Sequence, residues 1–396
     1  MDPTLRATDG AATKHSKRPH GAPTSLVQPS PVREARPMSR DRPFTSPYLL
    51  AAVLAVLLLG ISMGSLELGS TSRIGLGETL HGLLAMLGLK EPLEGSLQTI
   101  AELRLYKLFT SIGVGAALAL SGALFQGVFR NQLASPSIIG VTAGASLGAS
   151  VMIIALSGSA GSFFLVERAA GLGPIAISVA AFVGAVLSTL LVTLFATTRG
   201  RISVPTLLLT GIAVNAIVGG AIAAIQRFSV EEADLMRALM TWTFGRLEDR
   251  SLYHVLTIWV GLGLTVSIIP RVSSELDLFS AGEEDAHNLG VNTARVKWLS
   301  LGAGALCASL AVAVAGQIAF VGLITPHILR TIVGPAHRRL LWLSLLGGPV
   351  LLCGADLAQR VALGHGALPP GVIMSLLGGP FFLLLLLRNR GQVEAW

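Results

Sequence analysis

The sequence predicts an all-α, polytopic membrane protein with ten transmembrane helices. Of its 396 residues, 52% are hydrophobic and only 13% are charged, whereas a soluble domain carries about 25% charged residues. The 45 glycines favour a tightly packed helical bundle, because small residues let transmembrane helices approach closely. A spanning helix needs about 20 apolar residues, which gives ten candidate spans. They are residues 47–66, 106–129, 137–157, 174–196, 203–226, 251–269, 297–315, 318–333, 340–363 and 369–387.

The distribution of basic residues predicts the orientation of the chain. Residues 1–46 are basic, rich in Pro and Ser, and without apolar periodicity, which predicts a disordered tail and not a cleavable signal peptide. Ten spans place both termini on one side of the membrane. If that side is the cytoplasm, 19 of the 29 lysines and arginines lie in inner segments, as the positive-inside rule requires. We therefore predict cytoplasmic tails at residues 1–46 and 391–396 around a membrane domain at residues 47–390.

Two polar segments are predicted on the outer side. Residues 67–103 form a long acidic loop, and residues 227–250 are charged and carry a short amphipathic helix around residues 231–240. Cys307 and Cys353 fall inside apolar segments without neighbouring metal ligands. We therefore predict two small core residues rather than a zinc site or a disulfide.

The polar, acid-rich segment 276–292 lies between two apolar segments and predicts a helical knob outside the lipid, on the cytoplasmic side. Ser280 or Ala281 can begin a helix there, and Gly290 can end it. Acids are favoured in the first turn of a helix, and this turn holds Glu283, Glu284 and Asp285. The apolar side of the knob comprises Leu276, Leu278, Phe279, Ala286 and Leu289. A solvated connector between two spans is the alternative interpretation.

Polar residues at or within the spans are further candidates for function. Asp356 and Arg360 lie four residues apart near the outer end of one span, so they form either an internal ion pair or part of a transport site. Arg104 and Lys107 open another span at its outer end, where they are either interfacial anchors or a binding site for a partner. Buried amides usually form interhelical hydrogen bonds, and a place along a transport path is the alternative. These amides are Gln126, Asn131 and Asn215.

Residues 316–330 form an apolar segment that is interrupted by two glycines and a proline. Broken helices at membrane depth are tolerated where the backbone is buried in protein or lines a cavity. Gly322, Pro326 and His327 are therefore candidates for a transport path. A structural histidine with satisfied hydrogen bonds is the alternative for His327.

The sequence contains no motif for nucleotide binding or metal-dependent hydrolysis. It lacks a G-x-x-x-x-G-K-[ST] phosphate loop and an H-E-x-x-H pair. We therefore predict that the chain is not an enzyme, holds no metal or cofactor, and has no nucleic-acid partner. Two other classes remain open. An ion-coupled secondary transporter needs intramembrane carboxylates, of which Asp356 is the candidate, and a channel would need no knob for a partner.

Several blocks of sequence, in a fixed order between residues 47 and 390, resemble one family. They are Arg104–Lys107 with Gly115–Gly122 and Gln126, Asn131–Pro136 with Gly140–Ala145, Leu208–Ala213, Trp242–Gly245, Leu276–Val291, Gly316–Arg330 and Pro369–Arg388. These blocks are similar to those of the FecCD-type permeases, the membrane subunits of ABC importers for iron–siderophore complexes, haem and cobalamin. Tyr106, Lys107 and Gln132 depart from the family pattern, which has proline, arginine and proline at these places.

The resemblance implies a type II ABC importer permease fold with ten helices, paired with a second, identical or related permease subunit. It also implies a cytoplasmic ABC ATPase dimer, which would bind ATP and Mg²⁺, and an extracytoplasmic substrate-binding protein. The knob would form the coupling helices on the ATPases, through Leu278, Phe279, Glu283, Glu284, Asp285, Leu289 and Gly290. The binding protein would dock on Arg104, Lys107 and Arg360. The implied location is the bacterial cytoplasmic membrane, and the expected cargo is an iron–siderophore complex, with haem and cobalamin as alternatives.

Overall fold

The computed structural model describes residues 46–68, 74–157, 173–198, 201–364 and 368–388. Apart from Ser46, the two predicted tails lie outside these ranges. The described residues form fourteen α-helices, one short 3-10 helix and one two-stranded hairpin. The predicted all-α class is therefore confirmed.

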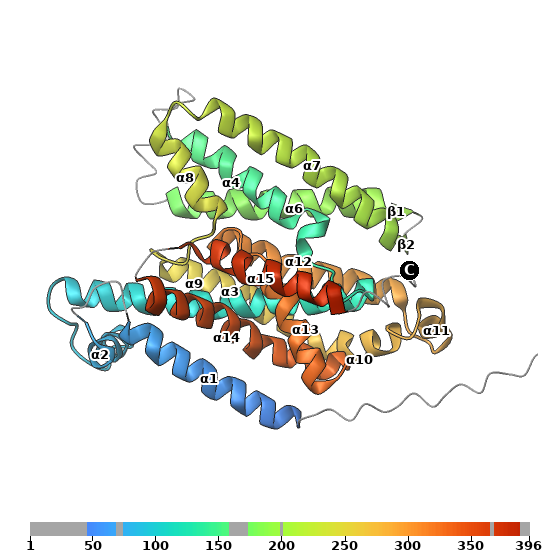
Figure 1. Cartoon of the computed structure of the whole chain (residues 1–396), viewed down its shortest axis with the longest axis horizontal. Helices are drawn as coiled ribbons and strands as arrows, with labels where there is room; N and C mark the ends of the chain where they lie inside the picture. The colour runs from blue at the N-terminus through green and yellow to red at the C-terminus, as the bar shows by residue number, and fades with distance from the viewer. Residues whose placement is uncertain (1–45, 69–73, 158–172, 199–200, 365–367, 389–396) are drawn as a thin grey trace, which may run out of the picture. The chain divides into compact units, whose positions relative to one another are not determined.

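Figure 1 shows the order of these elements along the chain. The first half contains α1 (Pro47–Glu67), α2 (Leu76–Met86), α3 (Ser96–Phe129), η1 (Pro136–Ile139), α4 (Val141–Ser157), α6 (Gly173–Ala196), the strands β1 (Thr197–Thr198) and β2 (Arg201–Ile202), and α7 (Val204–Phe228). The second half contains α8 (Ala233–Thr243), α9 (Leu252–Val266), α10 (Ile269–Phe279), α11 (Glu283–Asn288), α12 (Thr293–Ala315), α13 (Val321–Val333), α14 (His337–Leu363) and α15 (Pro370–Arg388). The strands β1 and β2 pair antiparallel between α6 and α7.

Each of the ten predicted spans contains a helix, although the helices differ in length. Among the described residues, six helices are long and apolar enough to cross a membrane, namely α1, α3, α6, α7, α12 and α14. The pair α9 and α10 makes a seventh span if it is taken together, with a bend of 56° between the two helices. The helices α4, α13 and α15 are apolar but shorter. Length and composition thus show six or seven spans, and ten remains a prediction.

The central helix of the fold is α3 (Figure 1), which packs against α14, α12, α13 and α9. Of its most apolar stretch of 18 residues, 89% is buried, because Gly, Ala, Ser and Leu alternate there and leave little bulk between neighbouring helices. The closest approach is at Gly122. A Cβ atom at this position would overlap the backbone of Gly322 in α13, so the contact requires a residue without a side chain.

Three other helices show how unevenly the fold is packed. The pair α4 and α6 is in close contact along its length, and a Cβ atom at Gly144 or Gly148 would overlap backbone carbonyls of α6. By contrast, only 17% of the corresponding stretch of α7 is buried. Leu209, Ile212 and Ile217 on α7 are 69%, 61% and 71% exposed. The apolar face of α7 is therefore available to lipid or to another subunit.

One of the two predicted outer segments needs correction. Residues 67–103, predicted as a loop, contain α2 and the first turns of α3, which begins at Ser96. The span pattern marked only the apolar part of α3, and the helix continues beyond it with polar side chains. The amphipathic helix predicted within residues 227–250 is present as α8. Cys307 and Cys353 are buried and free, which confirms their prediction as core residues.

Candidate functional site

Two groups of polar residues lie near opposite ends of α3. Lys107 lies about three turns into this helix and Arg130 directly follows its end, a separation of about 35 Å along the helix axis. This separation is close to the thickness of a bilayer core, about 30 Å. We call Lys107, Glu248, Asp356 and Arg360 the charge network. Arg130 lines the same cleft as Gly282, Glu283, Glu284 and Asp285 of the helical knob (residues 276–292).

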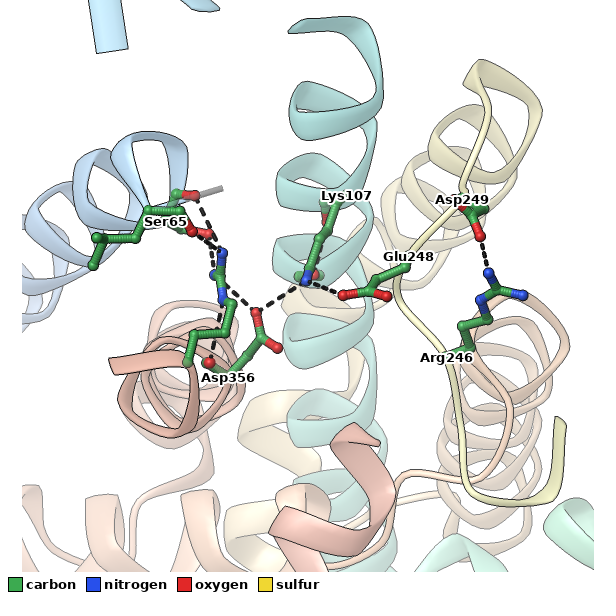
Figure 2. A network of polar contacts seen from close by, with 9 residues as sticks. Ser65, Lys107, Arg246, Glu248, Asp249 and Asp356 are labelled. Atoms are coloured by element: carbon green, nitrogen blue, oxygen red, sulfur yellow. Dashed lines mark hydrogen bonds and ion pairs between the residues drawn. The ribbon is translucent and has the colours of Figure 1, made fainter. Parts of the chain in front are cut away.

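The centre of the charge network is the carboxylate of Asp356 in α14, whose side chain is 8% exposed. Its Oδ2 atom lies 2.9 Å from Nη2 of Arg360 and 3.6 Å from Nζ of Lys107. The same ammonium lies 3.2 Å from Oε1 of Glu248. Figure 2 shows Lys107 between the two carboxylates, with α14 on one side and the loop after α8 on the other. The predicted ion pair of Asp356 with Arg360 is confirmed, and the network joins three segments.

The two arginines near this network fasten the end of α1. Arg360 donates to the Oγ atom of Ser65 at 2.6 Å and to its carbonyl oxygen at 3.3 Å. Arg104 donates from Nη1 to the carbonyl oxygens of Leu66 at 2.7 Å and Ile74 at 2.6 Å. The last carbonyls of a helix have no partner within the helix. These guanidinium groups therefore satisfy backbone acceptors at the end of α1 and just before α2.

The positions of the predicted docking residues differ from those of an exposed basic cluster. Arg104 and Arg360 are only 9% and 7% exposed, because their long side chains turn inward to the end of α1. The side chain of Lys107 is 16% exposed and is paired with two carboxylates. All three residues therefore have structural contacts, and their contact with a binding protein stays a prediction.

The loop that carries Glu248 is held by its own contacts. The backbone N–H of Arg246 donates to the carbonyl of Ala315 at the end of α12, at 2.7 Å. The guanidinium of Arg246 pairs with Asp249, as Figure 2 shows, and Asp249 has a φ of +53°, which is uncommon for a residue other than glycine. Burial, and secondly the charge of Arg246, lowers the pKa of Arg250 to about 10. This guanidinium remains charged at neutral pH.

The same loop lines a cavity of about 1010 Å³. Its walls are formed by α4, α6 and α8, with apolar contributions from Ile177, Leu235 and Trp242. Arg246 and Glu248 border it on the side of the charge network. Ligand pockets typically measure about 300–1,000 Å³, so the cavity is large enough for a small organic or chelated ligand. The sequence could not predict it, since its walls come from three separate segments of the chain.

The helical knob is formed by the end of α10 and the short helix α11. This second helix begins at Glu283, after Gly282 with a φ of +153°, so the predicted start at Ser280 or Ala281 is wrong. Gly290 ends it as predicted, with a φ of +88°. The N–H groups of Gly290 and of the next residue bond back to carbonyls of α11, which is the Schellman pattern of a helix end.

The apolar residues of the knob are divided between the core and the surface. Leu278 and Leu289 are 42% and 66% exposed, whereas Leu276 and Phe279 are 0% and 1% exposed. Residues three apart share a helix face, so Leu276 and Phe279 point together into the core. The prediction that Phe279 contacts an ATPase is therefore corrected. The exposed part of the knob contains Leu278, Leu289 and the acids Glu284 and Asp285.

One ion pair and one hydrogen-bonded carboxylate, neither of them predicted from the sequence, fasten the knob. Glu283 lies 2.7 Å from Nζ of Lys297 in α12. Asp277 accepts a hydrogen bond of 2.5 Å from the backbone N–H of His337 and lies 3.0 Å from its Nδ1 atom. This carboxylate stands at the first turn of α14, the end of a helix that favours negative charge. The only sequence signal for the first pair was a lysine near the start of an apolar helix.

The three candidate amides, two within α3 and α7 and one in the turn after α3, form hydrogen bonds to nearby backbone. Gln126 donates to the carbonyl of Gly322 in α13 at 3.4 Å, and Asn215 donates to that of Ser137 at 3.0 Å. Asn131 accepts from the N–H group two residues further on, at 2.8 Å. The contacts of Gln126 and Asn215 agree with the predicted hydrogen bonds between elements, whereas that of Asn131 is local to the turn after α3. A place along a transport path stays a prediction for them.

The interrupted segment 316–330 forms a non-helical stretch followed by α13, which contains Pro326. The ring of His327 contacts that of Phe381 edge to face, with 5.9 Å between centroids. Among the described residues, Nδ1 of His327 and two guanidinium nitrogens of Arg330 have no hydrogen-bond partner. The alternative of a fully bonded structural histidine is thus not met within the described part of the chain. No group of three His, Cys, Asp or Glu side chains there could hold a metal ion.

The arrangement of helices is that of a known family. Residues 52–388 match the sequence profile of the FecCD transport family. The chain belongs to the FecCD transport family. Among relatives, the hemin transport system permease protein HmuU of Yersinia pestis is 33% identical over 348 residues, which are 87% of this chain and 97% of the relative. The cobalamin import system permease protein BtuC of Halobacterium salinarum is 37% identical over 292 residues, 74% of this chain and 73% of the relative.

A solved structure supports the same assignment for this FecCD protein. It is described as an inward-facing conformation of a metal-chelate type ABC transporter. The similarity has a TM-score of 0.70 at 27% identity and covers 86% of this chain and 99% of the other. The type II ABC importer permease fold implied by the resemblance is thereby confirmed. This FecCD chain is a membrane-spanning permease subunit of an ABC importer.

Proposed function

We propose that this chain forms the translocation path of an ATP-driven importer for a metal chelate. The observation that carries the proposal is the match over nearly the whole membrane domain to a family whose named members include permeases for haem and cobalamin. The cavity of about 1010 Å³ beside α8 gives a bulky ligand a place in the chain. The carboxylate of Asp356 is neutralised by two cations, which disfavours an ion-coupled secondary transporter.

The first proposed partner is a pair of ABC ATPases that bind the helical knob in the cytoplasm. Leu278 and Leu289 are exposed apolar side chains at the tip, next to the exposed acids Glu284 and Asp285. Apolar anchors of this kind supply binding energy at the centre of an interface. Neighbouring acids give orientation and partner choice through electrostatic complementarity. The ATPases would hold the ATP and Mg²⁺ that this chain has no motif to bind.

The second proposed partner is a substrate-binding protein outside the membrane, at the end of α3 that carries Lys107. Lys107 and Glu248 are the partly exposed members of the charge network. A docking protein would therefore contact these two residues. The third is a second permease subunit, for which the exposed apolar face of α7 offers a contact surface. These assignments place both termini in the cytoplasm of a bacterial cell.

The proposed cargo is a metal chelate, with an iron–siderophore complex as the first candidate. Haem and cobalamin are the alternatives, and they are favoured by the names of the two relatives. All three are bulky and carry a chelated metal that the permease need not coordinate itself.

The test is uptake of labelled chelates by a strain that lacks this subunit. Restoring the wild-type chain should restore ATP-dependent uptake of a ferric siderophore, haem or cobalamin. The variant Leu278→Asp with Leu289→Asp should reach the membrane but fail to restore uptake or to co-purify an ATPase. The matched control is Leu87→Asp, at a residue that is 64% exposed after α2, and it should restore uptake fully. If none of the three chelates depends on the subunit, the proposal is wrong.

A further inference from the structure

One buried lysine connects the knob to a helix of the membrane domain. Lys297 lies near the start of α12 and is only 5% exposed. Its Nζ atom donates to both carboxylate oxygens of Glu283 at 2.7 and 2.8 Å and to the carbonyl oxygen of Ile202 at 3.1 Å. It also lies 5.8 Å from the centre of the Phe279 ring, a distance at which a cation attracts the ring face.

These contacts belong to four different elements. Glu283 begins α11, Phe279 ends α10, Ile202 ends β2, and Lys297 itself is in α12. An ammonium group has three donors, and here they are used on the knob and on the short hairpin that leads into α7. The polypeptide continues from Ile202 to the first residue of α7 through a single intervening residue. Lys297 therefore joins the knob to the start of α7.

The attachment matters because α7 is otherwise loosely held by the rest of the fold. It packs mainly on α4, α6 and η1, and only 17% of its most apolar stretch is buried. At its far end α7 leads into α8, whose residues Leu235, Thr241 and Trp242 line the large cavity. A displacement of the start of α7 along the helix axis would therefore move a wall of that cavity.

The surroundings of Lys297 leave room for such a movement. A cavity of about 320 Å³ is lined by Phe129, Arg130, Ile202, Glu283 and Lys297, together with the first residues of α7. A close-packed interior resists displacement, whereas an open space beside a polar contact lets the contact shift without breaking. The connection of Lys297 with Glu283 and Ile202 is therefore held by directed polar contacts and not by tight packing.

We propose that Lys297 is a positioning residue that transmits displacement of the knob to α7 and through it to the cavity wall formed by α8. The inference rests on the proposed function, in which ATPases bind the knob and move it. Because Glu283 is 47% exposed, removal of Lys297 leaves this carboxylate accessible to water. The knob also keeps its own helix end and its bond from Asp277 to α14, so the variant is expected to fold and to bind the ATPases.

The experiment follows the cavity wall with a single reactive cysteine at Thr241, since the native cysteines are buried. The rate at which a charged thiol reagent labels Thr241→Cys is measured in the permease–ATPase complex in nanodiscs, with and without the nucleotide analogue AMP-PNP. The second measurement is the number of chelate molecules imported per ATP hydrolysed. Neither reading changes if Lys297 only stabilises the fold, provided that the complex is intact.

The variants distinguish the specific contacts of Lys297 from general effects of charge. With Lys297→Met and with Glu283→Gln, the complex should form, but AMP-PNP should no longer change the labelling rate. Import per ATP should fall by about tenfold, a size typical of coupling between linked sites. Lys297→Arg keeps donors for both partners and should restore both readings. The matched control is Arg295→Met, which removes an exposed positive charge two residues earlier in α12 and should behave as wild type.

The outcomes distinguish this inference from the proposed function. If the wild-type chain binds no ATPase, the proposed function is wrong and the inference fails with it. If the wild-type complex imports a chelate and Lys297→Met imports as much per ATP, with an unchanged labelling response, only the inference is overturned. The same holds if Arg295→Met loses as much coupling as Lys297→Met.

Discussion

Replacement of Asp356 by asparagine should destabilise the membrane domain more than any replacement of an exposed acid. Its carboxylate is shared by Arg360 at 2.9 Å and Lys107 at 3.6 Å. The side chains of Arg360 and Asp356 are 5% and 8% exposed. Asparagine has nearly the same shape but carries no charge, so Asp356→Asn leaves a buried guanidinium without its counter-ion.

The size of the effect follows from what remains around the two cations. Breaking a buried ion pair by removing one partner costs about 3–5 kcal/mol. Arg360 keeps its bonds to Ser65 and to the carbonyl of Leu68 at 2.8 Å, and Lys107 keeps Glu248. These contacts place the loss near the lower limit, at about 3 kcal/mol. A double variant, Asp356→Asn with Arg360→Met, removes both charges and should lose less than the sum of the two single variants.

The assay is reversible unfolding of the purified chain in mixed detergent micelles, with the free energy of unfolding compared between variants. The matched control is Asp234→Asn, whose carboxylate is 99% exposed beside Arg237, and it should match wild type within error. The reasoning is refuted if Asp356→Asn is as stable as Asp234→Asn. It is also refuted if the losses in the double variant simply add.

Three further predictions concern packing, docking and nucleotide. Gly122→Val should lower the free energy of unfolding by about 1–3 kcal/mol or more, because its side chain would overlap the backbone of Gly322. The control Gly219→Val, where a Cβ atom meets nothing within 4 Å, should leave thermal unfolding unchanged. Lys107→Gln should weaken binding of the substrate-binding protein at low salt and less so at high salt. Lys90→Gln, an exposed residue after α2, should not, as a binding titration would show. The purified chain alone should bind no labelled ATP analogue in equilibrium dialysis; tight binding would contradict that.

The helices of the membrane domain could be predicted because lipid imposes a simple rule on sequence. Every spanning backbone must bond internally, so each apolar segment of sufficient length becomes a helix, and all ten candidate segments do contain one. The rule does not apply to segments outside the lipid. The helix α2 and the first turns of α3, from Ser96 onward, carry polar residues, and such a composition is equally typical of a loop.

The side chains of the knob show a second limit. Leu278 and Phe279 are neighbours and equally apolar, yet one is 42% and the other 1% exposed. The difference depends on the rotational phase of α10, which begins at Ile269 inside what the sequence predicted as a separate span. Without the correct start of this helix, the outward-facing residue cannot be told from the inward-facing one by its sequence position.

Contacts between segments that are distant in the chain could not be predicted from the sequence. Asp356 and Arg360 were predicted as a pair because they are four residues apart on one helix, a spacing that brings side chains together. Lys107 and Glu248 are 141 residues apart, and Glu283 reaches Lys297 only because the knob folds back on α12. No local pattern marks such pairs, since only the packing of the helices brings them together.

The contrast between α3 and α7 bears on how such a fold could transport anything. Alternating access requires one part of a transporter to move against another that stays fixed. The helix α3 is 89% buried over its most apolar stretch, and its contact with α13 at Gly122 and Gly322 leaves no space for sliding. Over the same length α7 is 17% buried, and it joins the hairpin fixed by Lys297 to a wall of the cavity. A force applied to the knob would therefore displace α7 more readily than the helices around α3. Because Lys297 contacts both the knob and the hairpin before α7, it determines whether that force reaches α7.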